Sequence, residues 1–188
     1  MKGHIKGKLK RILSSLNIGY AVPLSLEEKL WRLENDPAWM MIDLPVDGRS
    51  DMLEEVLVEE MSENRYRVAS SPSIRQGLAA DDVISLDNQS PAGFRLLQRG
   101  DNVCVHVFCD SVQRDEVESA LTQTLGRIGG RLDGTMGHTG LCFTIPALAG
   151  FTAIEGALQR VVGDEWSYSN VFDPETNEPL NWWLKRSK

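Results

Sequence analysis

The sequence predicts an α+β protein with a small β-barrel-like first half and a ferredoxin-like second half. Between residues 102 and 172 the apolar periodicity changes in the order strand, helix, strand, strand, helix, strand, which is the order of a ferredoxin-like split βαβ fold. Between residues 39 and 98, short strand-like runs alternate with turn signals and show little helical periodicity. This second pattern is typical of a small barrel or a curled sheet.

The first 38 residues are expected to form a basic, helical extension. Residues 1–26 hold five basic side chains and no acid, and an apolar stripe runs opposite the lysines: Ile5, Leu9, Ile12, Leu13 and Leu16. We favour a helix that packs this stripe on the body, but a membrane-surface or nucleic-acid helix is the alternative. Ser25 and Glu28 have capping-box spacing and predict a second helix over residues 25–34.

Five strands are expected in the unit that spans residues 39–100. They lie at residues 39–44, 55–61, 65–69, 82–86 and 93–97, and the second can pair with the third across a turn at residues 62–64. Residues 99–101 form the turn that separates the two halves.

The ferredoxin-like unit is expected to span residues 101–172. Its first strand, 103–108, places three valines on one face and Cys104, His106 and Phe108 on the other. A helix over 111–126, strands at 127–132 and 141–145 and a last strand at 166–171 complete the pattern. Thr152 and Glu155 have capping-box spacing and predict the start of the second helix, which Gly163 ends.

The C-terminal tail, residues 173–188, contains two adjacent tryptophans, Trp182 and Trp183. Exposing both to water would be costly, so we expect the tail to dock on the body; an interface with a partner is the alternative.

Several of these segments resemble a bacterial family catalogued as domain of unknown function 4265. The similar stretches are residues 64–68, residues 77–83, the strand that begins at Val103, the helix that ends at Gly126, and residues 165–168. The resemblance covers roughly residues 39–172. It implies a small β-barrel followed by a ferredoxin-like unit in a bacterial cytoplasm, and it implies no catalytic residue.

Composition indicates a globular protein. Of 188 residues, 41% are hydrophobic and 25% are charged. A chain of this length and composition can form a hydrophobic core without disulfide bonds or a structural metal. Three cysteines without a CxxC pair argue for a reducing compartment, and we predict a cytoplasmic protein. There is no apolar run of membrane-spanning length and no signal-peptide pattern.

Acidic residues are concentrated between residues 47 and 63, within a chain of net charge −7. The negative electric field of these residues would attract a basic partner and speed its capture. An equally weighted alternative is a charged edge strand that binds nothing. We expect the partner-binding residues to be Asp51, Glu54, Glu55, Glu59, Glu60 and Glu63. The acidic body excludes nucleic acid as its own ligand.

His106 and His138 are the candidate ligand-binding residues. Cys104 and His106 project from the same strand face and could supply two zinc ligands, but zinc needs at least three, and the only other candidates are Cys142 and His138. A packed histidine is therefore favoured over a metal ligand, and we predict neither a metal nor a cofactor. His138 lies in a glycine-rich hairpin, where exposed loops often hold binding sites.

No motif of nucleophilic, metalloprotease, P-loop or dinucleotide chemistry is present. A pairing of Cys109 with His138 stays open, although a lone thiol usually has a packing role. The sequence therefore favours a non-enzymatic binding protein, most plausibly an immunity or antitoxin-type inhibitor that occludes a basic toxin through its acidic face. The alternative is a small-molecule sensor with its ligand site on the ferredoxin-like half, and an enzyme comes third.

Overall fold

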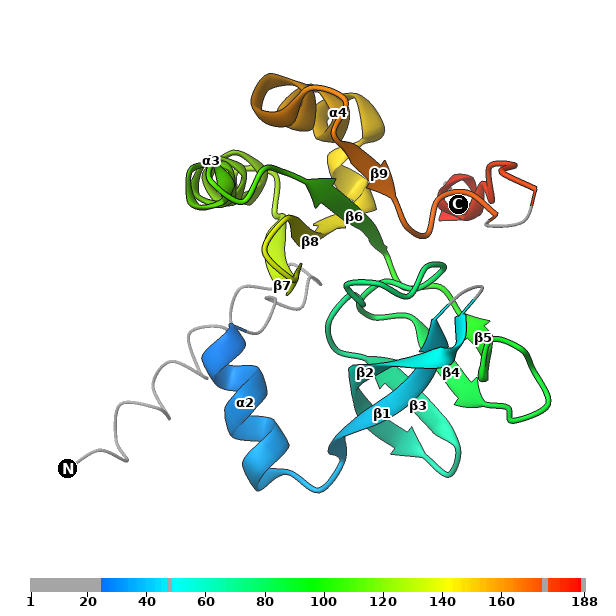
Figure 1. The fold of residues 1–188 in the computed structure, drawn as a ribbon. Coiled ribbons are helices and arrows are strands. Elements are labelled where there is room, and N and C mark those ends of the chain that lie inside the picture. The colour runs from blue at the N-terminus through cyan, green and yellow to red at the C-terminus, as the bar shows by residue number, and fades with distance from the viewer. Residues whose placement is uncertain (1–24, 47–48, 174–175, 187–188) are drawn as a thin grey trace, which may run out of the picture.

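The computed structural model describes residues 25–46, 49–173 and 176–186, and within them the chain forms two antiparallel sheets and three α-helices (Figure 1). The expected N-terminal helix over residues 1–24 lies outside the described residues. In the described part of the chain, no helix has the length and apolar character needed to cross a membrane.

The first sheet is an open meander and not a barrel. Its strands are β1 (Trp39–Val46), β2 (Arg49–Ser62), β3 (Arg65–Val68), β4 (Val83–Leu86) and β5 (Phe94–Gln98), and they are hydrogen-bonded in sequence order. Closing a barrel would require β1 to pair with β5, and the described strands do not pair in this way. The barrel-like prediction was therefore wrong in its closure, although each of the five expected strands is present.

One face of the first sheet covers a small core. Its largest members come from different strands and from the connection before β4: Leu44, Val58, Val68, Leu78 and Ile84, each fully buried. Because side chains alternate along a strand, the strand residues next to these core residues point to the opposite face of the sheet.

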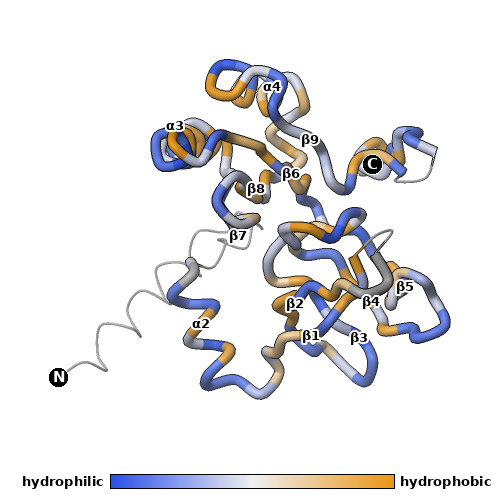
Figure 2. The backbone as a smooth tube through the Cα atoms, viewed as in Figure 1, coloured by the Kyte–Doolittle hydropathy of each residue, from blue (hydrophilic) through white to orange (hydrophobic). Residues whose placement is uncertain are grey.

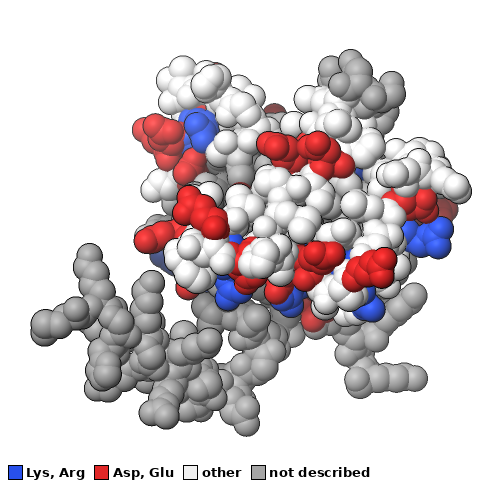
Figure 3. Space-filling model, turned by 90° about the horizontal axis from the view of Figure 1, so that it is seen from below, with Lys and Arg blue, Asp and Glu red and all other residues white. Residues whose placement is uncertain are grey.

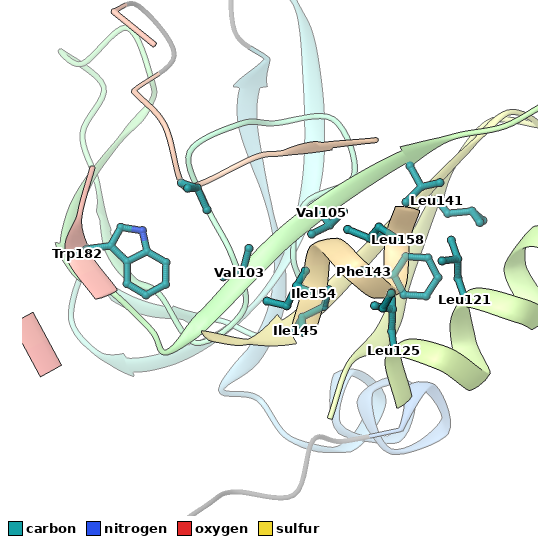
Figure 4. Packing of buried hydrophobic residues seen from close by; sticks show 13 residues of the cluster. Val103, Val105, Leu121, Leu125, Leu141, Phe143, Ile145, Ile154, Leu158 and Trp182 are labelled. Carbon is teal, nitrogen blue, oxygen red and sulfur yellow. The ribbon is translucent and has the colours of Figure 1, made fainter. Parts of the chain in front are cut away.

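The second sheet contains β6 (Asn102–Phe108), β7 (Arg131–Met136), β8 (Gly140–Pro146) and β9 (Trp166–Tyr168) in the order β7-β8-β6-β9. Helices α3 (Arg114–Gly126) and α4 (Phe151–Val162) lie on the side of this sheet that is away from the first sheet (Figure 1). Their leucines and isoleucine pack against the core face of β6 and β8 (Figure 4), around Val105, Leu121, Phe143, Ile145 and Leu158.

The opposite face of the second sheet is turned toward the connection between β3 and β4. This connection, residues 69–82, is called the 69–82 loop below. Two backbone amides attach the loop to the second half: Ser71 N donates to Asp133 of β7 (2.7 Å), and Gly77 N donates to the Ser169 carbonyl (2.8 Å). The loop therefore fills the space between the two sheets.

Helix α2 (Leu26–Asn35) has the predicted capping box, because the Ser25 hydroxyl accepts from Glu28 N and the Glu28 carboxylate accepts from Ser25 N. It is amphipathic, with hydrophilic and hydrophobic segments alternating along it in Figure 2. Its Lys29 is buried and pairs with Asp133 at 2.9 Å, which ties the helix to the second sheet.

The capping box predicted at Thr152 is not formed. A 3₁₀ turn, Ala147–Ala149, ends at Gly150, whose φ of 80° favours glycine, and the Gly150 carbonyl accepts the first amides of α4. Thr152 is therefore already inside the helix.

Several boundaries in the second half also differ from the prediction, and β9 ends at Tyr168 and not at residue 171. Helix α3 begins at Arg114, because Asp110 instead closes a turn by accepting from Val112 N at 3.0 Å. Strand β7 begins at Arg131 and not at residue 127, because Gly130 N still donates to the Leu125 carbonyl at 2.9 Å as the helix unwinds.

The C-terminal tail packs on the core that the second sheet forms with helices α3 and α4. Trp182 is buried in it, and its indole N–H donates to the Asn170 carbonyl at 2.8 Å. Trp183 packs on Phe151 with tilted rings whose centroids are 4.8 Å apart.

Candidate metal-binding site

Three potential metal ligands converge on the inner face of the second sheet: Cys104, His106 and Cys142. Their Sγ and ring nitrogen atoms all lie within 4.8 Å of one another. Cys104 and His106 are alternate residues of β6, and His106 is directly opposite Cys142 of β8 in the antiparallel register. The alternation that sends Val103 and Val105 into the helix-covered core therefore sends these three side chains to the other face.

The spacing of the ligand atoms suits a tetrahedral metal. The two sulfurs are 3.7 Å apart, and Cys104 Sγ lies 3.6 Å from His106 Nε2. Zinc bonds of about 2.3 Å to sulfur and about 2.0–2.1 Å to nitrogen place two sulfurs about 3.8 Å apart, and a sulfur and a nitrogen about 3.6 Å apart. Two of the three ligand separations therefore already match those of a tetrahedral zinc site, and the third is within 4.8 Å.

The same register disfavours a disulfide. Cys104 lies opposite Thr144, so Cys104 and Cys142 are diagonal neighbours. Diagonal positions in a sheet have Cβ atoms up to about 7–8 Å apart, whereas a disulfide needs about 3.8 Å. The thiols are free, with their sulfurs 3.7 Å apart.

A backbone carbonyl from the 69–82 loop completes the cluster. Pro72 O lies 3.1 Å from His106 Nε2, 3.3 Å from Cys142 Sγ and 3.8 Å from Cys104 Sγ. His106 Nε2 can donate a hydrogen bond to this carbonyl, and the two sulfurs lie in contact with it. The carbonyl is an oxygen donor within reach of a metal bound by the three side chains.

The side chains of the cluster are shielded from solvent. Cys104 and Cys142 have no exposed area and His106 is 4% exposed. Burial raises the pKa of the Cys104 thiol, but hydrogen bonds from Cys142 and His106 outweigh burial and lower that pKa to about 6. A thiolate is the form that binds metals.

The cysteines and histidine differ in the direction of their pKa shifts. Burial alone would lower the pKa of His106, but its contacts with Cys104 raise it. The pKa of Cys142 is raised, chiefly because its thiol donates to Cys104 and because it is buried. The arrangement thus favours a thiolate at Cys104, a neutral thiol at Cys142, and the protonated form of His106 more than an isolated histidine would.

Ser169 adds a further polar group beside the cluster. Its side-chain oxygen is buried and has no hydrogen bond of acceptable geometry in the described part of the chain. It nevertheless lies close enough to Cys104 for its hydroxyl to favour the thiolate and lower the pKa.

Glu54 of β2 holds the Pro72 segment in place. One carboxylate oxygen accepts from Ser73 N at 2.6 Å, the other accepts from Arg75 N at 2.6 Å, and both lie within 3.2 Å of Ile74 N. The carboxylate therefore caps three consecutive amides directly after Pro72.

Asp133 fixes the other side of the loop. Its Oδ2 accepts from Ser71 N at 2.7 Å and from the Thr144 hydroxyl at 2.6 Å, while Oδ1 accepts from Lys29 Nζ and Arg131 Nε. Thr144 is two residues after Cys142 on the same strand face. The loop carbonyl and the β8 cysteine are thus held by one buried hydrogen-bond network.

The predicted acidic site is divided by the structure. Asp51 to Glu60 belong to β2 and Glu63 to the following turn, and alternation places Glu54 and Glu60 on the opposite face from Glu55 and Glu59. Glu59 is paired with Arg67, and Glu54 is bonded to the 69–82 loop. Figure 3 shows acidic side chains in separate groups with basic and uncharged residues between them.

The two histidines are also separated. His106 lies in the cluster, whereas His138 is exposed at the tip of the β7–β8 hairpin. Cys142 was named from the sequence as one of two further candidate ligands, and the structure brings it, and not His138, to Cys104 and His106. The Pro72 carbonyl was not predicted. Leu141, Phe143 and Ile145 alternate as core residues, so Cys142 could have been assigned to the His106 face if the pairing of β6 with β8 had been known.

Comparison with protein families identifies the chain. The family model described as Domain of unknown function (DUF4265) matches residues 54–168. The chain belongs to this family. The DUF4265 match includes all three side-chain ligands, Pro72 and Glu54.

Among solved structures, the DUF4265 chain is similar to one titled "Novel crystal structure of a hypothetical protein from Neisseria gonorrhoeae". The two share 17% sequence identity, with a TM-score of 0.48, and the match covers 69% of this chain and 92% of that one. No curated protein matches the chain.

Proposed function

We propose that this protein is a non-enzymatic metal-binding protein that holds one zinc-class ion with Cys104, His106 and Cys142. The observation that supports this proposal best is the convergence of two thiols and one imidazole at tetrahedral spacing on a buried sheet face. The Pro72 carbonyl is the proposed fourth ligand. Soft thiolates with an imidazole favour zinc over magnesium or calcium, which prefer oxygen ligands.

The closed geometry favours a structural or regulatory role over catalysis. Catalytic zinc sites keep an open position for water or substrate, whereas structural sites are closed. Here the three side chains are buried beneath the 69–82 loop. An ion bound to β6, β8 and this loop would join the two sheets, because the loop is also bonded to β2 through Glu54.

The test is a metal-loading experiment with cysteine variants. Reduced protein is incubated with Zn²⁺ or Co²⁺ and desalted, the metal content is measured by mass spectrometry, and thiolate-to-cobalt absorption is recorded. We expect one ion per chain, and Cys142→Ser should weaken binding by at least about 100-fold, because loss of even an outer-shell partner costs 10–100-fold.

Cys109→Ser is the matched control, because Cys109 is a half-buried thiol outside the cluster. This variant should bind like the wild type. Wild-type protein that retains no ion, or equal binding by the Cys142→Ser variant, would show that the cluster is only a packed pair of reduced thiols.

For the second half we infer the ferredoxin-like fold. Strand β8 lies between β6 and β7 and is antiparallel to both, so β6 and β7 are parallel strands joined through α3 with another strand between them. By the same reasoning β8 and β9, joined through α4, are parallel across β6. Two split βαβ units of this kind support the assignment.

Inhibition of a basic toxin is the second candidate function, and one local feature favours it. Asp43 and Glu55 are direct cross-strand partners on the outer face of the first sheet, and neither forms an ion pair among the described residues. Facing like charges destabilise a sheet unless a cation binds there. The neighbouring Leu53 and Met41 are 58% and 41% exposed.

Affinity capture at low and high salt tests this second function. The Glu55→Lys variant should lose a stoichiometric basic partner that the wild type retains at low salt, whereas Glu116→Lys on α3 should not. Equal capture by both variants would exclude this surface as the binding face.

A further inference from the structure

A groove on the second half lies beside the edge strand β9, on the C-terminal side of the molecule. It has a volume of about 510 Å³ and is formed by β9, Glu155 of α4, the segment that begins at Ser169, and Gln76 of the 69–82 loop. Its walls are aromatic, from Trp166, Tyr168 and Phe172, and Glu155 and Asp173 bring carboxylates to it. The volume is within the range of small-molecule sites.

The aromatic walls are held in a defined arrangement. The rings of Trp166 and Tyr168 meet edge to face with centroids 5.0 Å apart, and Tyr168 lies 6.4 Å from Phe172. The Trp166 indole donates to the Gly163 carbonyl at 3.0 Å, and Phe151 packs edge to face on Tyr168. A ligand would therefore meet rings that are already oriented.

The charge of the groove is negative. Glu155 accepts a hydrogen bond from the Tyr168 hydroxyl at 3.3 Å, and burial together with this carboxylate raises the pKa of Tyr168. Among the described residues, those that line the groove are acidic, polar or aromatic and include neither lysine nor arginine. Aromatic faces and carboxylates both attract cations, but the aromatic faces favour weakly hydrated organic cations over metal ions.

We propose that this groove binds an organic ammonium cation with methyl groups on its nitrogen. The methyl groups would contact the faces of Trp166, Tyr168 and Phe172, and Glu155 would balance the charge. The same chemistry occurs in a free quaternary amine and in a methylated lysine side chain of a peptide. The groove shares Ser169 with the surroundings of the cysteine and histidine cluster, but its proposed ligand contacts none of Cys104, His106 and Cys142, so its failure would leave the metal proposal unaffected.

Choline and 3,3-dimethylbutan-1-ol provide a sharp test, because the alcohol is a neutral ligand of nearly the same shape. Binding is followed by NMR titration of the full chain and by tryptophan fluorescence. We expect choline to bind about tenfold more tightly than the alcohol, since the charge contributes through the aromatic faces. Equal affinities, or binding of neither, would overturn the proposal.

Variants place the ligand in the groove. Glu155→Gln keeps an acceptor for Tyr168 but removes the charge, and Phe172→Leu removes one ring at a residue that is already 38% exposed. Each should weaken choline binding severalfold, whereas the exposed Glu116→Gln on α3 should not. Equal affinity in Glu155→Gln and Glu116→Gln would contradict the assignment.

A pair of peptides distinguishes the two sources of the cation. Preference for a trimethyllysine peptide over both the unmodified peptide and choline would identify a methylated protein partner. Binding of choline with no gain from the peptide would identify a free amine. Both results support the ammonium site, and binding of the unmodified lysine peptide as tightly as the methylated one would overturn it.

Discussion

Substitution of Glu54 by glutamine should destabilise the fold, although this residue appears in the sequence as one of a run of surface acids. Both carboxylate oxygens are used: Oε1 accepts from Ser73 N and Oε2 from Arg75 N, each at 2.6 Å, and Ile74 N lies between them. A glutamine side chain has one oxygen and one NH₂ group. Whichever way the amide is turned, its NH₂ faces a backbone N–H.

The expected magnitude follows from these contacts. A hydrogen bond to a charged group contributes about 1.5–3 kcal/mol, and a buried donor left without a partner costs about 1–3 kcal/mol. Loss of one such bond and weakening of a second should lower the free energy of unfolding by about 2–4 kcal/mol. For a chain of this length, each 1 kcal/mol lowers Tm by about 2–4 °C, so the Glu54→Gln variant should melt about 4–16 °C below the wild type.

Glu55 provides the control, because it is the next residue, carries the same charge and is exposed on the opposite face of β2. The Glu55→Gln variant should stay within about 0.5 kcal/mol of the wild type. Thermal unfolding followed by circular dichroism, with urea unfolding as a second measurement, compares the two. Equal melting temperatures for the two variants would refute the assignment of Glu54 to the 69–82 loop.

Two further substitutions test other parts of the fold. Asp133→Asn should lower the free energy of unfolding by about 3–5 kcal/mol, because it leaves buried Lys29 without its counter-ion. Urea unfolding measures this change, and a loss below about 1 kcal/mol would mean that water replaces Asp133 as the partner of Lys29. Leu158→Ala should cost about 2–5 kcal/mol, because Leu158 is fully buried between α4 and the second sheet, whereas Leu148→Ala, at a residue that is 68% exposed, should have little effect.

The sequence could predict local structure better than it could predict pairing. Alternation along β6 correctly placed Cys104 and His106 on one face, since that pattern depends only on the geometry of a single strand. The barrel prediction failed because closure depends on whether β1 meets β5, and neither strand encodes that contact in its own periodicity.

The cluster of Cys104, His106 and Cys142 could not be predicted for the same reason, because it also depends on strand pairing. Cys142 is 38 residues from Cys104 in the chain, and their proximity depends on the register between β6 and β8. Pro72 comes from a loop without periodicity, and its carbonyl is placed by Glu54 and Asp133. Glu54 itself was predicted to bind a partner because of its charge, although alternation along β2 places it on the same face as Val56 and Val58.

These contacts determine what a bound ion could do. The 69–82 loop is bonded to the first sheet through Glu54 and to the second through Asp133, so it already bridges the two sheets without a metal. An ion held by Cys104, His106, Cys142 and Pro72 would add a third attachment at the centre of that bridge. Its free energy of binding would then stabilise the arrangement of the sheets, and the buried site leaves no open position for a reacting substrate. A role in fixing or signalling conformation is therefore the one that this geometry favours over chemistry at the metal.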